Sequence, residues 1–250
     1  FVVGHYRKDG KTHVSRPWAI GRAGNGVGGV VSTVNDLLKY ARFHMGDGKS
    51  PSGNKIIKRK SLQAMRVKQV SAGGRGDMGI TWFIRYADNL TAYAHGGATN
   101  GQQAYFFYIP EKDFALAILT NSDEGGVITA QTFGWALDLY FGIKLKSPKP
   151  MKNPQDGKEC IGRYKIGTEC FDIKTKGKYL VFHHIPLGGF PTPDEPPGPA
   201  LPPMRFAFYE KDNLIGLDEP YNGALADIIR DEKGRVKYFR VGGRAHLKIK

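Results

Sequence analysis

The order of apolar and polar residues divides the chain into two regions with different patterns. Residues 146–157 carry three prolines and few apolar side chains, which is typical of a linker. Before this stretch the apolar spacing mixes helical and strand periods, and after it only short alternating runs occur. The pattern therefore predicts one domain over residues 1–145, a linker over 146–157 and a second domain over 158–250.

The first region predicts helices combined with antiparallel strands. Apolar residues of 34–43 lie at helical spacing, and Thr33 can form a capping box with Asp36 at the start of that helix. A short helix is expected from Ser61 to residue 67, and a longer one over 123–140. Four apolar runs lie between these two helices and predict strands at residues 79–86, 90–95, 103–109 and 114–121. The expected fold class is α+β.

The second region predicts strands alone. About eight short runs of alternating polarity, separated by glycine or charged turns, indicate an antiparallel up-and-down barrel or a sandwich. The runs lie at residues 164–166, 171–175, 179–184, 205–209, 214–217, 224–230, 236–241 and 246–249. The proline-rich segment 191–199 cannot continue a strand, so we expect an extended loop, which is more readily a rigid connector than a ligand flap.

Composition narrows the classes of function. The net charge of +14 is scattered along the chain and has no zinc-ligand spacing or aromatic RNA-binding motif beside it, so we expect no nucleic-acid partner. No apolar run reaches the roughly 18 residues of a membrane span. Free thiols are favoured over a disulfide for Cys160 and Cys170, whose redox state is left open. The first residues have no signal-peptide pattern and no initiating Met, so we expect a chain that begins mid-protein, of unknown compartment.

Two short motifs match known patterns without the context that they need. Residues 24–29 fit the dinucleotide pattern G-x-G-x-x-G, but no convincing strand precedes them. Ser52 and Lys55 fit S-x-x-K, in which Lys activates a nucleophilic Ser from one helical turn away, but they lie in a polar loop. We therefore expect no nucleotide, no other cofactor and no metal, and no nucleophile at Ser52.

The most informative stretch runs from Tyr93 to Asn121. A strand ending in His95-Gly96-Gly97 is followed by a glycine corner and a hairpin of two apolar strands. Paired glycines let a substrate approach the strand edge closely. An edge with free N–H and C=O groups can pair with a peptide-like substrate, and one such N–H can stabilise an oxyanion. The local pattern equally fits a buried hairpin with a hydrogen-bonded histidine.

These residues resemble the third conserved motif of class C β-lactamases and their relatives, the DD-peptidases, esterases and D-amino-acid peptidases of the penicillin-recognising superfamily. In that superfamily Lys-Thr-Gly or His-x-Gly stands where this chain has His95-Gly96-Gly97. The family's helix entry resembles residues 28–37, its Gly-Leu-Gly-Trp strand resembles residues 79–82, and its Pro-Glu-Lys turn resembles residues 110–112. The resemblance covers about residues 1–142 and implies part of a β-lactamase/transpeptidase-like antiparallel sheet with helices. Residues 158–250 resemble the lipocalin-like barrel appended to some relatives, an analogy of fold alone.

The resemblance also implies roles for individual residues. His95 would face the substrate, and the backbone N–H of Ala98 would form one half of an oxyanion hole. A histidine, unlike a lysine, is mostly uncharged near pH 7, which favours peptidase or esterase chemistry over β-lactam hydrolysis. The remaining residues of this strand and turn would bind substrate: Gly96, Gly97, Thr99 and Asn100.

The family's other two motifs, Ser-x-x-Lys and Tyr-x-Asn, lie N-terminal to the matching region, and the chain contains no Tyr-x-Asn. The predicted function is therefore a serine hydrolase that works through an acyl-enzyme, with the nucleophile outside this chain. The expected partners are a peptide-like or ester substrate, the missing half of the catalytic domain on the same gene or a second chain, and possible further copies in a homo-oligomer. The alternatives are a half that has lost catalysis, or a binding module whose barrel holds a small apolar ligand.

Overall fold

The computed structural model describes residues 2–16, 21–167, 169–189, 194 and 196–250. The chain forms two compact units. The first comprises Phe1–Ser71 and Gly76–Leu145, and the second comprises Lys146–Lys250 together with the short segment Ala72–Arg75.

The first unit is built on a six-stranded antiparallel sheet with the strand order β3-β4-β5-β6-β7-β8. Its strands are β3 (Val70–Ser71), β4 (Asp77–Met78), β5 (Phe83–Ala87), β6 (Leu90–Thr99), β7 (Gln102–Ile109) and β8 (Phe114–Thr120). A separate hairpin pairs β1 (His5–Lys8) with β2 (Lys11–Val14). The helices of this unit are α1 (Asn25–Gly28), α2 (Val34–Met45), α3 (Arg59–Met65) and α4 (Gly125–Phe141).

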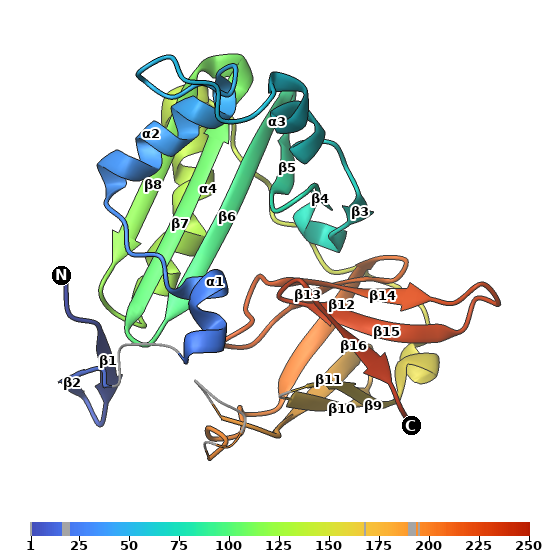
Figure 1. Cartoon of the computed structure of the whole chain (residues 1–250). Helices are drawn as coiled ribbons and strands as arrows, with labels where there is room; N and C mark the ends of the chain where they lie inside the picture. The colour runs from blue at the N-terminus through green and yellow to red at the C-terminus, as the bar shows by residue number, and fades with distance from the viewer. Residues whose placement is uncertain (1, 17–20, 168, 190–193, 195) are drawn as a thin grey trace. The chain divides into compact units, whose positions relative to one another are not determined.

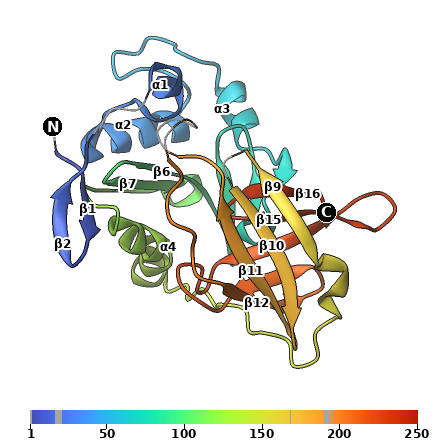
Figure 2. The ribbon, with the colours of Figure 1, turned by 90° about the horizontal axis from the view of Figure 1, so that it is seen from below.

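Two helices cover opposite faces of this sheet, as Figures 1 and 2 show for α2 and α4. Side chains alternate between the faces along each strand. Phe106 and Tyr108 of β7 therefore pack with Ala41 of α2, whereas Phe107 packs with Leu137 of α4. The expected α+β class is confirmed, and both faces of the central strands are buried.

The observed starts of α2, α3 and β5 agree only in part with the predicted ones. The hydroxyl oxygen of Thr33 accepts a hydrogen bond from the Asp36 N–H at 3.2 Å and donates one to the Asp36 carboxylate at 3.0 Å, so the predicted cap of α2 is confirmed. The prediction of a helix start at Ser61 is wrong, because α3 begins at Arg59 without a side-chain cap. The strand predicted over residues 79–86 begins only at Phe83, after Thr81 adopts a left-handed φ of 69°.

The second unit is a closed up-and-down barrel of eight antiparallel strands (Figures 1 and 2), which confirms the predicted barrel and excludes the sandwich. Pairing of Leu247 with Lys165 joins the last strand to the first. A 3₁₀ turn, η4 (Gly157–Cys160), precedes the strands β9 (Gly162–Ile166), β10 (Glu169–Lys176), β11 (Tyr179–Pro186), β12 (Met204–Glu210), β13 (Asn213–Gly216), β14 (Leu225–Arg230), β15 (Val236–Val241) and β16 (Arg244–Lys248).

Side chains fill the middle of the barrel. An eight-stranded barrel is just wide enough for this. Six aromatic residues in the interior are buried together: Tyr164, Phe171, Phe182, Phe206, Phe208 and Phe239. Cys160 and Cys170 are buried free thiols, and burial raises the pKa of the Cys160 thiol to about 12. Among the described residues, no helix is long and apolar enough to cross a membrane.

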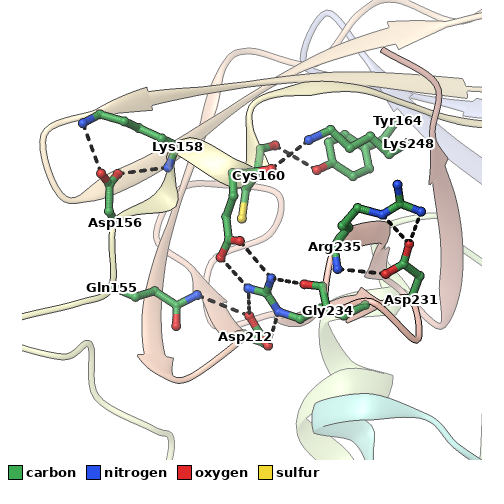
Figure 3. A network of polar contacts seen from close by, with 12 residues as sticks. Gln155, Asp156, Lys158, Cys160, Tyr164, Asp212, Asp231, Gly234, Arg235 and Lys248 are labelled. Atoms are coloured by element: carbon green, nitrogen blue, oxygen red, sulfur yellow. Dashed lines mark hydrogen bonds and ion pairs between the residues drawn. The ribbon is translucent and has the colours of Figure 1, made fainter.

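An arginine network holds η4 to the loops between strands of the second unit (Figure 3). The guanidinium of Arg230 donates to Glu159 at 2.8 Å, to Asp212 at 2.8 and 2.9 Å, and to the Gly234 carbonyl at 2.8 Å. Figure 3 labels Asp212 and Gly234 of this network. The Arg230 side chain is only 20% exposed. These hydrogen bonds are the largest influence that lowers the pKa of both the Glu159 and Asp212 carboxyl groups, and Lys248 and Lys211 contribute less.

Replacement of Arg230 by Met should lower the free energy of unfolding by about 2 kcal/mol, because it leaves two partly buried carboxylates without their cation. The loss is smaller than for a fully buried pair because Glu159 is 47% exposed, so water partly solvates its carboxylate. Arg235→Met is the matched control, since Arg235 is 73% exposed in its pair with Asp231 and should matter little. Urea denaturation of both variants measures the difference, and equal losses would contradict the expectation.

The buried His44 should make the free energy of unfolding depend on pH. The imidazole is 3% exposed between Tyr40 and Trp82, and burial together with the nearby charge of Arg66 lowers its pKa to about 4. The unfolded chain, with a histidine pKa of about 6.5, binds more protons than the folded one between these values. Stability should therefore fall as the pH drops from about 6.5 to about 4, by up to about 3 kcal/mol.

A His44→Phe variant should lose this part of the pH dependence while keeping the aromatic packing. The measurement is the free energy of unfolding at half-unit pH intervals between 7 and 4, and His13→Phe, at an exposed histidine, is the control. A His44→Phe curve parallel to that of the unsubstituted protein would show that His44 is not the titrating group.

Candidate active-site strand

The two edges of β6 are paired over different parts of the strand. β7 pairs with β6 from Tyr93 to Thr99, whereas β5 pairs only from Leu90 to Ala94. From His95 onward the second edge has no strand partner in the described chain, and residues 95–98 are exposed. The sequence placed the end of this strand at His95, four residues too early.

The turn between β6 and β7 determines which backbone groups of β6 face the open edge. Thr99 and Gln102 pair across a two-residue turn, so their N–H and C=O groups must bond to each other. Successive residues of a strand point their N–H and C=O groups to opposite edges, so these groups of residues 95 and 97 also face β7. The N–H and C=O groups of Gly96 and Ala98 consequently point to the open edge, where an extended ligand can pair with them.

His95 is oriented by its own strand. Its Nδ1 lies 2.7 Å from the Gly96 carbonyl oxygen, and because a carbonyl can only accept, Nδ1 carries the proton. In the neutral ring Nε2 is then an unprotonated acceptor. The ring of Phe83, at the start of β5, lies 5.9 Å from the imidazole and limits its position.

The two glycines of the motif differ in their surroundings. A Cβ atom at Gly96 would lie 3.4 Å from the Ala104 carbonyl oxygen, whereas a Cβ at Gly97 would meet nothing within 4 Å. The space over Gly97 is therefore open, and a ligand can approach its backbone directly.

Thr99 and Asn100 are part of a tightly packed turn. The α-carbon of Gly4 lies so close to this turn that an added Cβ would be 2.6 Å from the Asn100 carbonyl oxygen. His5 N–H donates to the Gly101 carbonyl at 3.2 Å, and the Asp123 carboxylate accepts from the Gly101 N–H at 2.7 Å. The N-terminal segment thus fixes the far end of β6, a contact that the sequence pattern did not predict.

The other two candidate motifs lie outside this strand. Residues 24–29 form a 3₁₀ turn (η1, Arg22–Gly24) and the short helix α1, which lies beside β6 (Figure 1); residues 17–20 before them lie outside the described part. Ser52 lies in an exposed loop, where its hydroxyl is 2.8 Å from that of Ser50. No helix carries Ser52 and Lys55, so the expectation that this match is a loop is confirmed.

A model of the Beta-lactamase family matches residues 2–138, just over half of the chain, and the chain belongs to this family. Among its relatives is Penicillin-binding protein 4 of Amycolatopsis lactamdurans, which is 30% identical over 154 residues; these cover 57% of this chain and 40% of that protein.

Solved structures agree on the fold. A crystal structure of SurE matches 99% of this chain and 55% of its own chain, with a TM-score of 0.73 and 19% identity. A second, of SurE with D-Leu, matches 87% of this chain and 50% of its own, with a TM-score of 0.64 and 19% identity. The chain thus spans about half the length of these relatives or less, and the fold likeness includes the barrel.

Alanine substitutions at Gly4 and Gly97 should have different effects on stability, because Gly4 is closely packed and the space over Gly97 is open. Gly4→Ala should lower the free energy of unfolding by about 2 kcal/mol, because its Cβ would collide with backbone that cannot rotate away. Gly97→Ala should change it by less than about 0.5 kcal/mol, because the new Cβ enters open space. Chemical denaturation of the two variants measures both values. A large loss at Gly97 would mean that the space above the strand is filled.

Proposed function

We propose that this chain supplies the substrate-binding strand of a serine hydrolase that acts on peptide-like amides or esters through an acyl-enzyme. The observation that carries the proposal is the open half of β6, with its backbone groups at Gly96 and Ala98 exposed. An extended acyl group pairs with such an edge as an added strand. The Ala98 N–H then donates to the oxyanion that forms as the serine attacks.

His95 sets the substrate preference in this proposal. With Nδ1 donating to Gly96, Nε2 of the neutral ring accepts a hydrogen bond from a substrate N–H or O–H. A neutral acceptor holds a carboxylate less strongly than a lysine ammonium does. We therefore propose peptidase or esterase activity rather than efficient β-lactam hydrolysis, with Thr99 and Asn100 contacting the far end of the substrate.

The nucleophile lies on a further segment of the protein, encoded by the same gene or carried by a second chain. The chain spans 40% of its curated relative, so room for such a segment exists in the family. β8 is the last strand of the sheet, and its outer edge has no partner among the described strands. Beside it, α4 exposes large apolar side chains that a second segment would cover: Val127, Ile128, Trp135, Leu139 and Tyr140.

The relatives suggest which acyl groups to test. One is named for penicillin binding, and one SurE structure contains D-Leu. We propose that the acyl group next to the scissile bond is D-configured, and that a penicillin labels the enzyme slowly. Paired thioesters that end in D-Leu or L-Leu compare the two configurations at equal leaving-group reactivity.

The test is to produce this chain together with the candidate segment that carries Ser-x-x-Lys and Tyr-x-Asn, and to react the complex with a fluorophosphonate. The labelled serine should lie in the added segment, and Ser52→Ala should label as fast as the unsubstituted chain. His95→Ala should lower kcat/KM by roughly tenfold to a hundredfold. A label on Ser52, or no label on any serine of the complex, would contradict the proposal.

The second candidate, a barrel that holds a small apolar ligand, has less support. The aromatic side chains that would line such a ligand already contact one another, with the Phe182 and Phe239 rings 4.5 Å apart. A packed core of this kind cannot admit a ligand without rearrangement.

A further inference from the structure

A cavity of about 590 Å³ opens where β9, β10, β11 and β16 meet the loops of the second unit. It is lined by charged and apolar residues, among them Ile166, Glu169, His184, Pro186, Pro199 and Arg244. Phe171 of the packed interior contacts the rings of His184 and His246 at 5.5 and 5.1 Å, so a polar layer separates the cavity from the apolar core.

Glu169 at this cavity is a charged carboxylate held by two imidazoles. His246 Nε2 lies 3.1 Å from one carboxylate oxygen and His184 Nε2 lies 3.4 Å from the other. The hydrogen bond from His246 is the largest influence that lowers the pKa of Glu169. The Glu169 side chain keeps 20% of its surface exposed, so a ligand can reach it.

Both imidazoles donate to Glu169 from Nε2. His184 Nδ1 accepts the Leu201 N–H at 3.2 Å, so this ring carries its only proton on Nε2. The His246 side chain is 1% exposed and its Nδ1 has no partner among the described residues, so a proton there would be a buried donor without an acceptor in that part of the chain. The two bonds from the imidazoles leave further lone pairs on the Glu169 carboxylate oxygens free to accept a hydrogen bond from a ligand.

Arg244 supplies the opposite charge at the same cavity. Its side chain is exposed, and within the described residues it makes no ion pair or hydrogen bond. Its field contributes to the lowered pKa of Glu169, which places the two charges within electrostatic reach without a direct bridge. A guanidinium fork that faces a cavity and is free on all sides is suited to bind a carboxylate in two hydrogen bonds.

We propose that this cavity binds a small zwitterion, a free amino acid with an apolar side chain. Its ammonium group donates to Glu169, its carboxylate accepts from Arg244, and its side chain packs on Ile166, Pro186 and Pro199. Glu169 would repel a purely anionic ligand, and Arg244 would repel a purely cationic one. The two charges together therefore select a ligand that carries both. The site involves only the second unit and does not depend on the proposed hydrolase activity.

Calorimetric titration of the full chain with three phenylalanine derivatives tests this site. Phenylalanine should bind at least about tenfold more tightly than N-acetylphenylalanine, which lacks the ammonium, or phenylalaninamide, which lacks the carboxylate. Arg244→Gln should weaken phenylalanine binding by at least about tenfold. It should not weaken phenylalaninamide binding, because the amide has no carboxylate to pair with Arg244 and its ammonium is repelled by the guanidinium. Because Arg244 is exposed, this variant should fold normally.

Three controls show whether phenylalanine binds in this cavity and not elsewhere on the chain. Lys237→Gln removes an exposed positive charge from another part of the barrel and should bind phenylalanine normally. His95→Ala should also bind normally, since it alters only the strand of the proposed hydrolase. Side-chain ¹⁵N spectra should show the His184 resonances shifting on titration. No binding of phenylalanine at millimolar concentration, or equal binding of all three derivatives, would overturn the proposal.

Discussion

The unequal pairing of β6 is the constraint on which the candidate site depends. A strand that is bonded along both edges cannot bind a substrate, and one bonded along neither is not held in place. Here β7 pairs with β6 from Tyr93 to Thr99, while β5 stops at Ala94 and leaves the other edge open beyond it. The two-residue turn after Thr99 then sets which residues present their backbone outward. The position of Ala98 on that edge follows from the length of the turn.

The sequence predicted the elements better than their ends and their contacts. Apolar periodicity located α2, α4 and the strands β5 to β8, because burial on one or both faces imposes that spacing. The two-residue strands β3 and β4 are too short to show such a period and were not predicted. The sequence pattern ended β6 at His95, because glycines lower strand propensity although pairing with β7 keeps the strand extended to Thr99. It also placed the start of α3 at Ser61, where a good capping residue is present but unused.

Contacts between distant segments carry no such periodic pattern. The packing of Gly4 on Asn100 and the bond from Gly101 N–H to Asp123 join residues that lie far apart in the sequence. The cavity beside Glu169 is of the same kind, since His184, Arg244 and Glu169 come from three strands. Each of these residues looks like an ordinary polar position in the sequence. Their significance depends on the closed pairing of the barrel, which no local pattern specifies.

The two units also differ in how they meet other molecules in solution. The barrel has all of its strands paired in a ring, so it offers no strand edge to another chain. The sheet of the first unit ends at β8 and is half open at β6, and both edges are templates for pairing. The first unit is therefore the part of the chain where association through strand pairing is expected. The backbone groups of β6 that the proposed substrate would pair with are equally available to any other extended chain.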